Sequence, residues 1–284
     1  MNQTLWAFWH DGEENAPPYI QACLKTWRDK NPEWFLEVLT YDTISSFLPL
    51  DNLIGDHWTE IPVQAFTDLI RINLIAKYGG VWIDATCICK TPLDYWLPRL
   101  MQGGFFAFDR PGPGREISSW FLSGSEDSYI VNRWKSHCNN FWTSLKGTEV
   151  RHKVKEIYPG LSWDSPPWMD PSYWSDYHQV VPYFWFHFGF GFLVASDKRF
   201  AAQWSNIPKI SADLPHFYAR GGYADKDNEE MEAEWIHGIS PLYKTAFKKM
   251  SPQYDASNPM HFLYEKISGS QHPDLAYSAA EMVR

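Results

Sequence analysis

The sequence has few cysteines, no long apolar run and no secretory signal pattern. Its four cysteines, Cys23, Cys87, Cys89 and Cys138, lack the second Cys or His pair of a zinc site and fit reduced thiols. No stretch of about 18 apolar residues suggests a membrane-spanning helix. The opening MNQTLWAFWHDGEE lacks the basic and then apolar pattern of a secretory signal. We therefore expect a cytoplasmic protein without a transmembrane segment.

Basic stripes and the common glycine-rich phosphate motifs are also missing. The net charge is -9, and this argues against nucleic acid as a partner because phosphate backbones are bound through clustered Lys and Arg. Neither G-x-G-x-x-G nor G-x-x-x-x-G-K-[ST] follows an expected strand, so a dinucleotide site and a P-loop are not expected. Any phosphate must then be held by a metal ion and a lysine.

Apolar residues are abundant enough for a sizeable core. Hydrophobic residues make up 44% of the chain and charged residues 21%, which is typical of a globular protein. A chain of 284 residues exceeds the usual domain length, but α/β enzymes often form one unit of about 250 residues. We expect one domain. Residues 4–9 and 34–40 read as strands and residues 17–30 as the helix between them, the order that begins a parallel sheet.

The segment 61–86, IPVQAFTDLIRINLIAKYGGVWIDAT, is the most informative part of the chain. Pro62 suits a first helical position, the Gly79-Gly80 pair ends the helix, and the apolar run 81–83 suits a buried strand. Asp84 then stands at the carboxyl end of that strand. Open α/β sheets bind their ligands at this end, so the segment predicts a strand-end site.

The helix of this segment carries a polar stripe on an otherwise apolar surface. At about 100° per residue, Gln64, Asp68 and Arg71 fall on one side of the helix. Asp and Arg are almost never fully buried unless they are paired. The stripe is therefore either an internal ion pair or the lining of a polar cavity, and spacing alone leans toward the ion pair.

Later segments are predicted from local punctuation and periodicity. Residues 91–97 suit a short helix with Thr91 as N-cap, and residues 103–109 suit a strand. Residues 110–115 are rich in Pro and Gly and suggest a loop, after which order resumes at 117–123. Residues 129–145 suit a helix that packs through residues spaced by four.

The stretch FTDLIRINLIAKYGGVWIDAT resembles the sugar-binding region of glycosyltransferase family 32, and specifically that of capsular polysaccharide synthesis proteins. Weaker agreement comes from TLWAFWHDGEENAPPYIQACLKTW, ISSWFLSGS, VVPYFWFHFGFGFL and HGISPLYKTAFK. The resemblance implies a GT-A type α/β fold, with a Rossmann-like mixed sheet flanked by helices. It implies one domain over residues 1–284, with a nucleotide-sugar-binding half at 1–110 and, at 111–284, an acceptor half with a C-terminal donor-closing segment.

The activity that the resemblance implies is retaining glycosyl transfer. The donor is expected to be a nucleotide sugar, with a preference for UDP-sugars, and the acceptor a glycan or lipid-linked glycan of capsular or surface polysaccharide synthesis. Peripheral contact with the inner face of the membrane is compatible with such an acceptor, although no basic amphipathic helix supports it. Two rivals stay open: a glycoside hydrolase that uses two carboxylates, and a catalytically inactive carbohydrate-binding protein.

The resemblance implies that Asp84, Arg71 and Asp68 are the catalytic residues, and the donor-binding residues are carried over from the family pattern one by one. Asp68 and Arg71 match the (S/T)-D-x-x-R positions that hold donor-sugar hydroxyls, and Asp84 matches the first carboxylate of the D-x-D motif. Trp9 stands where an aromatic ring stacks on the base, although a core tryptophan is an equal alternative. Thr86 replaces the second carboxylate of the motif, and this leaves dependence on Mn²⁺ or Mg²⁺ open.

The segment 237–244 resembles the C-terminal stretch in which such enzymes place a metal ligand and a phosphate-binding lysine. His237 is the second expected metal ligand beside Asp84. Ser240 and Lys244 are expected to contact the donor, with Lys244 neutralising the diphosphate as negative charge develops on it. Without the resemblance, a surface loop would be the simpler interpretation.

An acceptor subsite is expected in the aromatic and acidic stretch 162–192. Aromatic faces stack on sugar rings while carboxylates accept hydrogen bonds from hydroxyls. The chosen acceptor-binding residues are Trp163, Asp164, Trp185 and His187. A retaining transferase needs either a carboxylate nucleophile or a front-side route in which the leaving phosphate helps to deprotonate the acceptor. The resemblance implies the front-side route, which suits a sequence that shows no evident nucleophile.

Overall fold

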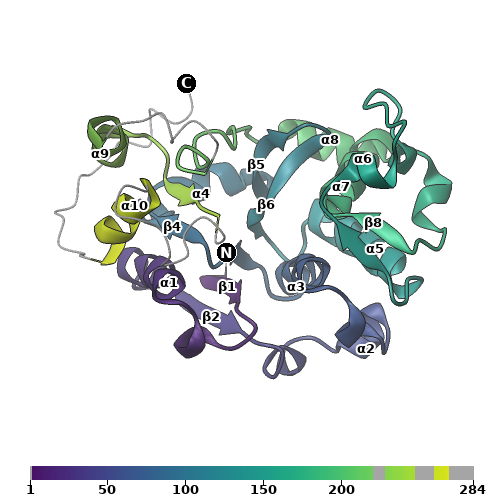
Figure 1. Ribbon diagram of the computed structural model, residues 1–284, viewed down its shortest axis with the longest axis horizontal. Coiled ribbons are helices and arrows are strands. Elements are labelled where there is room, and N and C mark those ends of the chain that lie inside the picture. The colour runs from purple at the N-terminus through teal and green to yellow at the C-terminus, as the bar shows by residue number, and fades with distance from the viewer. Residues whose placement is uncertain (1, 220–227, 247–258, 269–284) are drawn as a thin grey trace. The chain divides into compact units, whose positions relative to one another are not determined.

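The computed structural model describes residues 2–219, 228–246 and 259–268 (Figure 1). Internal contacts divide it into two compact units with interleaved segments. Unit 1 comprises residues 1–2, 41–82 and 100–209, and unit 2 comprises residues 3–40, 83–99 and 210–284. The expected single domain with a division after residue 110 stays a prediction.

The main sheet has five strands in the order β2-β1-β3-β6-β5. Their bounds are Thr4–Phe8 for β1, Phe35–Leu39 for β2, Gly80–Ile83 for β3, Phe105–Gly112 for β5 and Arg115–Gly124 for β6. Strands β1 and β2 are parallel, whereas β5 and β6 are antiparallel. The sheet is therefore mixed, and the expected α/β class is confirmed.

In unit 2, α1 (Pro18–Lys30) connects β1 to β2, as the sequence predicts. Its buried side includes Cys23 and Trp27, and the Trp27 indole donates to the carbonyl oxygen of Cys87 at 2.8 Å. That carbonyl belongs to β4 (Cys87–Cys89), which pairs antiparallel with β9 (Leu242–Lys244). The helices α4 (Leu93–Leu100), α9 (Asn228–His237) and α10 (Pro259–Ser268) complete the described elements, apart from a 3-10 turn at Glu13–Asn15. Helix α4 begins at Leu93, so Thr91 is not its N-cap.

In unit 1, the helices α3 (Val63–Tyr78), α5 (Tyr129–Thr143) and α7 (Trp185–Ser196) hold the core. Asn73 of α3 and Asn139 of α5 exchange two amide hydrogen bonds, at 2.8 and 3.0 Å. The remaining elements are α2 (Leu50–Ile54), α6 (Val154–Ile157), α8 (Lys198–Asn206), the parallel pair β7 (Glu149–Arg151) and β8 (Val180–Pro182), and 3-10 turns at Ile44–Ser46, Trp58–Glu60, Met101–Gly103, Pro167–Met169 and Pro171–Trp174.

The expected loop at residues 110–115 is wrong. Strand β5 continues to Gly112 and β6 starts at Arg115, so the two form a hairpin. Gly114 has a φ of 65°, a conformation that glycine adopts without the penalty of a side chain. Two register shifts on either side of Asp109 accommodate Pro111 in the strand. The Pro and Gly residues therefore mark bulges and a tight turn.

None of the helices in the described ranges is long and apolar enough to cross a membrane.

Candidate functional site

Asp84 lies at the carboxyl end of β3, as the sequence predicts. The strand itself is buried throughout, and Gly79 and Gly80, with φ of 66° and 92°, turn the chain from α3 into it. After the strand, the amide of Cys87 donates to the Asp84 carbonyl at 2.9 Å and closes a turn. The Asp84 side chain is 28% exposed, so water and solutes reach the carboxylate.

Lys244 meets Asp84 across the strand pair β4–β9. Its Nζ lies 2.9 Å from Asp84 Oδ2 and also donates to the hydroxyl of Thr86. The register places Lys244 opposite Cys87, directly after the turn. The structure thus brings together three of the expected donor-binding residues, although 158 positions separate Thr86 from Lys244 in the sequence.

Backbone and hydroxyl contacts fix this arrangement. The Lys244 amide donates to the Pro215 carbonyl at 2.8 Å, and the Thr245 amide donates to the Thr86 carbonyl at 3.2 Å. The Thr245 hydroxyl donates to the same carbonyl at 2.6 Å and accepts from the Tyr19 hydroxyl at 2.9 Å. Sequence reasoning missed Tyr19, Pro215 and Thr245 as supports because no local pattern marks a residue that acts only through a distant strand.

The other residues of unit 2 that are predicted to contact the donor or a metal ion have different surroundings. Trp9 is half-buried directly after β1, with its ring centroid 5.4 Å from that of His10. His237 ends α9 and is exposed. Ser240 is 1% exposed, and its hydroxyl donates to the Leu242 carbonyl within its own turn. Their predicted contacts with the donor base, a metal ion and the donor stay predictions.

Asp68 and Arg71 form a buried ion pair in unit 1. Their side chains are 9% and 6% exposed, and Arg71 Nη2 lies 3.3 Å from Asp68 Oδ1. Arg71 also donates to the Ser119 carbonyl at 2.6 Å and lies over the Trp82 ring at 5.0 Å. These contacts support the internal ion pair among the two alternatives, and the sugar-binding role stays a prediction. Ser119 and Trp82 are partners that the helical spacing alone does not reveal.

The four expected acceptor residues differ in exposure. Trp163 is 41% exposed, and the neighbouring Asp164 is also exposed. Trp185 and His187 lie on α7 and are only 1% and 6% exposed, within an aromatic interior. The structure therefore places two of these residues at the surface of unit 1 and two in its core, and the acceptor role of each stays a prediction.

All four cysteines are free and buried, which confirms the expected thiols. Burial raises the pKa of Cys23 to about 12, despite the lowering effects of a hydrogen bond with Tyr19 and the charge of Lys244. Burial also raises the pKa of Cys87, which Lys244 lowers only in part. Burial therefore favours the protonated form of the thiols beside the Asp84 turn, and a protonated thiol is a poor nucleophile.

The residues around Asp84 do not form the donor set of a divalent metal on their own. Asp84 and Thr86 supply one carboxylate and one hydroxyl, and the Lys244 ammonium contacts Asp84 Oδ2 and the Thr86 hydroxyl. Hard cations prefer several oxygen ligands, commonly carboxylates. Across the described residues, no group of three His, Cys, Asp or Glu side chains is arranged to hold a metal ion.

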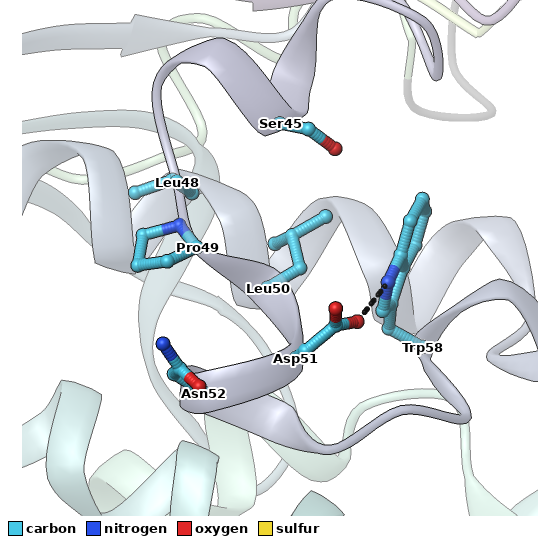
Figure 2. Close-up of a pocket in the computed structure, with 7 residues that line it drawn as sticks. All are labelled: Ser45, Leu48, Pro49, Leu50, Asp51, Asn52 and Trp58. Atoms are coloured by element: carbon cyan, nitrogen blue, oxygen red, sulfur yellow. Dashed lines mark hydrogen bonds between the residues drawn. The ribbon is translucent and has the colours of Figure 1, made fainter.

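A separate hollow of about 290 Å³ lies in unit 1 and contains none of the predicted site residues. Figure 2 shows its lining, in which the Trp58 indole donates to Asp51 at 2.9 Å. The lining consists of Ser45, Leu48, Pro49, Leu50, Asp51, Asn52 and Trp58.

The protein is of the α/β class, with a mixed sheet and a lysine-paired carboxylate after a central strand. The chain belongs to the capsular polysaccharide synthesis protein family, whose model matches residues 1–148. It is 29% identical over 192 residues to the glycosyltransferase afumC of Aspergillus fumigatus, covering 59% of this chain and 49% of that protein. It is 26% identical over 173 residues to the O-glycosyltransferase braB of Annulohypoxylon truncatum, covering 54% of this chain and 40% of the relative.

Among solved structures, the PaToxG glycosyltransferase aligns with a TM-score of 0.38 and 12% identity, over 50% of this chain and 61% of that one. The chain spans less than half the length of the two curated relatives described above.

Proposed function

We propose that this protein is a GT-A type glycosyltransferase that moves a sugar from a nucleotide-sugar donor to a glycan acceptor. Family membership supports the proposal, as do two relatives whose names describe glycosyltransferases. The observation that carries it is the Asp84–Lys244 pair, a cation held at 2.9 Å beside a strand-end carboxylate that is open to water. Such a cation stabilises the negative charge that develops on a departing nucleoside diphosphate.

In the proposed reaction, the bond between the anomeric carbon and the donor phosphate oxygen breaks, and its electron pair stays on the departing diphosphate. The acceptor oxygen bonds to the anomeric carbon, and its proton passes to the departing phosphate. Lys244 stabilises the negative charge that develops on the diphosphate. Asp84 holds the ammonium in place through the ion pair, and this positioning is made before the donor binds.

Retention of anomeric configuration is the stereochemistry that we propose, by the front-side route. That route needs orientation and charge stabilisation more than a dedicated base. We further propose a UDP-sugar donor, an acceptor of capsular or surface polysaccharide, and action at the cytoplasmic face of the membrane. These finer assignments extend the family resemblance of the block 67–86, the D-x-D-like stretch that ends in Thr86.

A panel of nucleotide sugars and glycan acceptors tests the proposal. Binding of a donor raises the melting temperature of the native protein, and free nucleotide should appear only when an acceptor is present. Cleavage of an oligosaccharide without any nucleotide requirement would instead indicate a glycoside hydrolase. Binding of glycans without binding of any nucleotide sugar would indicate a carbohydrate-binding protein. The anomeric configuration of the product, read by NMR, decides between retention and inversion.

A further inference from the structure

The Lys244 ammonium contacts one side-chain oxygen of each polar residue in this D-x-D-like motif. Its Nζ is 2.9 Å from Asp84 Oδ2 and contacts Thr86 Oγ1 as well. We propose that Lys244 takes the place of the divalent cation, so that this protein binds a nucleoside diphosphate without a metal ion. The inference rests on the proposed function, because it concerns how that same site holds the donor.

The charges at the motif support the replacement of a divalent cation by Lys244. One carboxylate and one ammonium already neutralise each other, and the threonine hydroxyl adds no charge. A divalent cation at Asp84 and Thr86 would lie directly against the Lys244 ammonium, and like charges at contact distance repel strongly. Among the described residues, this motif would offer it one carboxylate, that of Asp84, where hard cations prefer several oxygen ligands. The ammonium therefore suits these two oxygens better than Mg²⁺ or Mn²⁺ does.

The lysine is held in register by the fold. The amide of Lys244 bonds to the Pro215 carbonyl at 2.8 Å, and the pairing with Cys87 sets the direction of its side chain. The neighbouring Thr245 is fixed on Thr86 through two hydrogen bonds to one carbonyl. A cation positioned before the donor arrives avoids the cost of ordering a long side chain during binding.

Exposure shows that the pair can meet a ligand. The side chains of Lys244 and Asp84 are 18% and 28% exposed. Lys90, in the same unit, is used differently, because its ammonium donates to the carbonyl oxygen of Gly238 and lies over the Tyr243 ring at 5.6 Å. Burial lowers the pKa of Lys90 to about 8, against the raising effect of Glu234. Lys90 braces the segment that carries β9, and Lys244 faces the motif.

Thr86 and Lys244 belong together in this scheme. A second carboxylate at position 86 would leave a net negative charge beside a single ammonium, and that charge would attract a divalent ion. The proposal therefore predicts that Thr86→Asp combined with Lys244→Ala creates a metal site in a protein that has none at this motif. Thr86→Ser, which keeps the hydroxyl, serves as the conservative control.

The first experiment measures binding rather than activity. UDP, GDP and ADP are titrated into the full chain by calorimetry, once with EDTA and once with Mn²⁺, and Mn²⁺ binding is followed by its EPR signal. We expect the affinity for the preferred diphosphate to agree within about two-fold between the two conditions, because the cation is covalently part of the chain. No Mn²⁺ should be immobilised, with or without the nucleotide.

The second experiment removes the charge. Lys244→Met should weaken binding of the preferred diphosphate by about 10- to 100-fold, the range expected for a lost hydrogen bond to a charged group. Lys25→Met is the matched control, because Lys25 is exposed on α1 and pairs only with Asp29 in the contacts described for it. It should bind the diphosphate as the unmodified protein does. Circular dichroism of each variant verifies that the fold is retained.

The third experiment installs the metal site. The double variant Thr86→Asp, Lys244→Ala should immobilise Mn²⁺ and should bind the diphosphate only when Mn²⁺ is present. Because this variant carries two changes, its melting curve is compared with that of Thr86→Ser. If it does not fold, the titrations of the unmodified protein decide the question alone.

Two results overturn the inference and are distinct from failure of the proposed function. One is a Mn²⁺ ion immobilised by the unmodified protein and released by Asp84→Asn, together with loss of diphosphate binding in EDTA. The other is a diphosphate affinity unchanged by Lys244→Met. In both cases a nucleotide still binds, so the proposed transferase stands. If no nucleotide binds under either condition, the proposed function itself fails, and the inference fails with it.

Discussion

Each unit of the molecule contains an Asp paired with a basic side chain, and the two pairs differ in exposure. In unit 1, the side chains of Arg71 and Asp68 are 6% and 9% exposed, and in unit 2 those of Lys244 and Asp84 are 18% and 28% exposed. A buried pair must satisfy its charges internally, whereas a partly hydrated pair can exchange partners with a ligand. We therefore predict that the first pair contributes mainly to stability and the second mainly to binding.

The largest expected effect comes from breaking the buried pair. Arg71→Ala leaves the Asp68 carboxylate without its guanidinium partner, and loss of one member of a buried pair costs about 3–5 kcal/mol of unfolding free energy. It also removes the contacts with Ser119 and the Trp82 ring. Urea denaturation measures the change.

Arg28→Ala is the control for this prediction, since Arg28 pairs with Glu13 and its side chain is 44% exposed. That change should cost at most about 1 kcal/mol. A loss below about 1 kcal/mol for Arg71→Ala would contradict the structural role and favour a hydrated sugar site.

The fold was most predictable where its signals are local. β1, α1, β2 and the passage from α3 to β3 were predicted to within about two residues, since periodicity and Gly or Pro punctuation act over a few positions. The hairpin at Gly112 to Arg115 was missed because Pro and Gly mark a loop, a bulge and a tight turn alike. Which of these three structures forms depends on the pairing of β5 with β6.

The site was predictable in its residue types but not in its long-range partners. Asp84 and Lys244 are predicted from two separate motifs, and the structure brings them together through the β4–β9 register. The burial of Trp185 on α7 was not evident, because an aromatic run suits either a core or a sugar platform. Only the packing of distant elements separates these alternatives.

The next expected effect tests another polar pair inside unit 1. Asn73→Ala leaves the Asn139 amide without its partner on α3, and an unsatisfied buried amide costs about 1–3 kcal/mol. Replacing both residues by Ala removes the polar groups together, so the double change should cost less than the sum of Asn73→Ala and Asn139→Ala. A double-mutant cycle by urea denaturation measures the coupling. Simple additivity would show that the two amides do not depend on each other.

A comparable loss of stability is expected when the pH is lowered from 7 to 5. His137 is 8% exposed, and burial, followed by the charge of Arg133, lowers its pKa to about 3. Because the unfolded histidine titrates near 6.5, the unfolded state binds more protons between these values, and stability falls as the pH falls below about 6.5. Between pH 7 and pH 5 this one residue accounts for about 2 kcal/mol of lost stability.

His137→Phe should remove that part of the pH dependence, because phenylalanine does not titrate and suits the aromatic contacts with Trp174 and Phe192. Chemical denaturation at pH 7 and pH 5 measures the slope for both proteins. Equal slopes would mean that His137 is protonated as readily in the folded state as in the unfolded chain. The interior of unit 1 would then accept a charge that its packing is expected to exclude.

The smallest expected change in stability comes from the partly exposed pair of Asp84 and Lys244, which is also the pair of the proposed site. Asp84→Asn removes a charge that water reaches, so it should cost no more than about 1 kcal/mol. Asp68→Asn, in the buried pair, leaves the Arg71 guanidinium without its carboxylate and should cost more. Asp84→Asn should lose transfer activity while its melting temperature stays close to that of the unmodified protein, because Lys244 is no longer held in place. If instead Asp84→Asn destabilises the protein as much as Asp68→Asn does, both pairs are structural, and the candidate site must lie elsewhere in the chain.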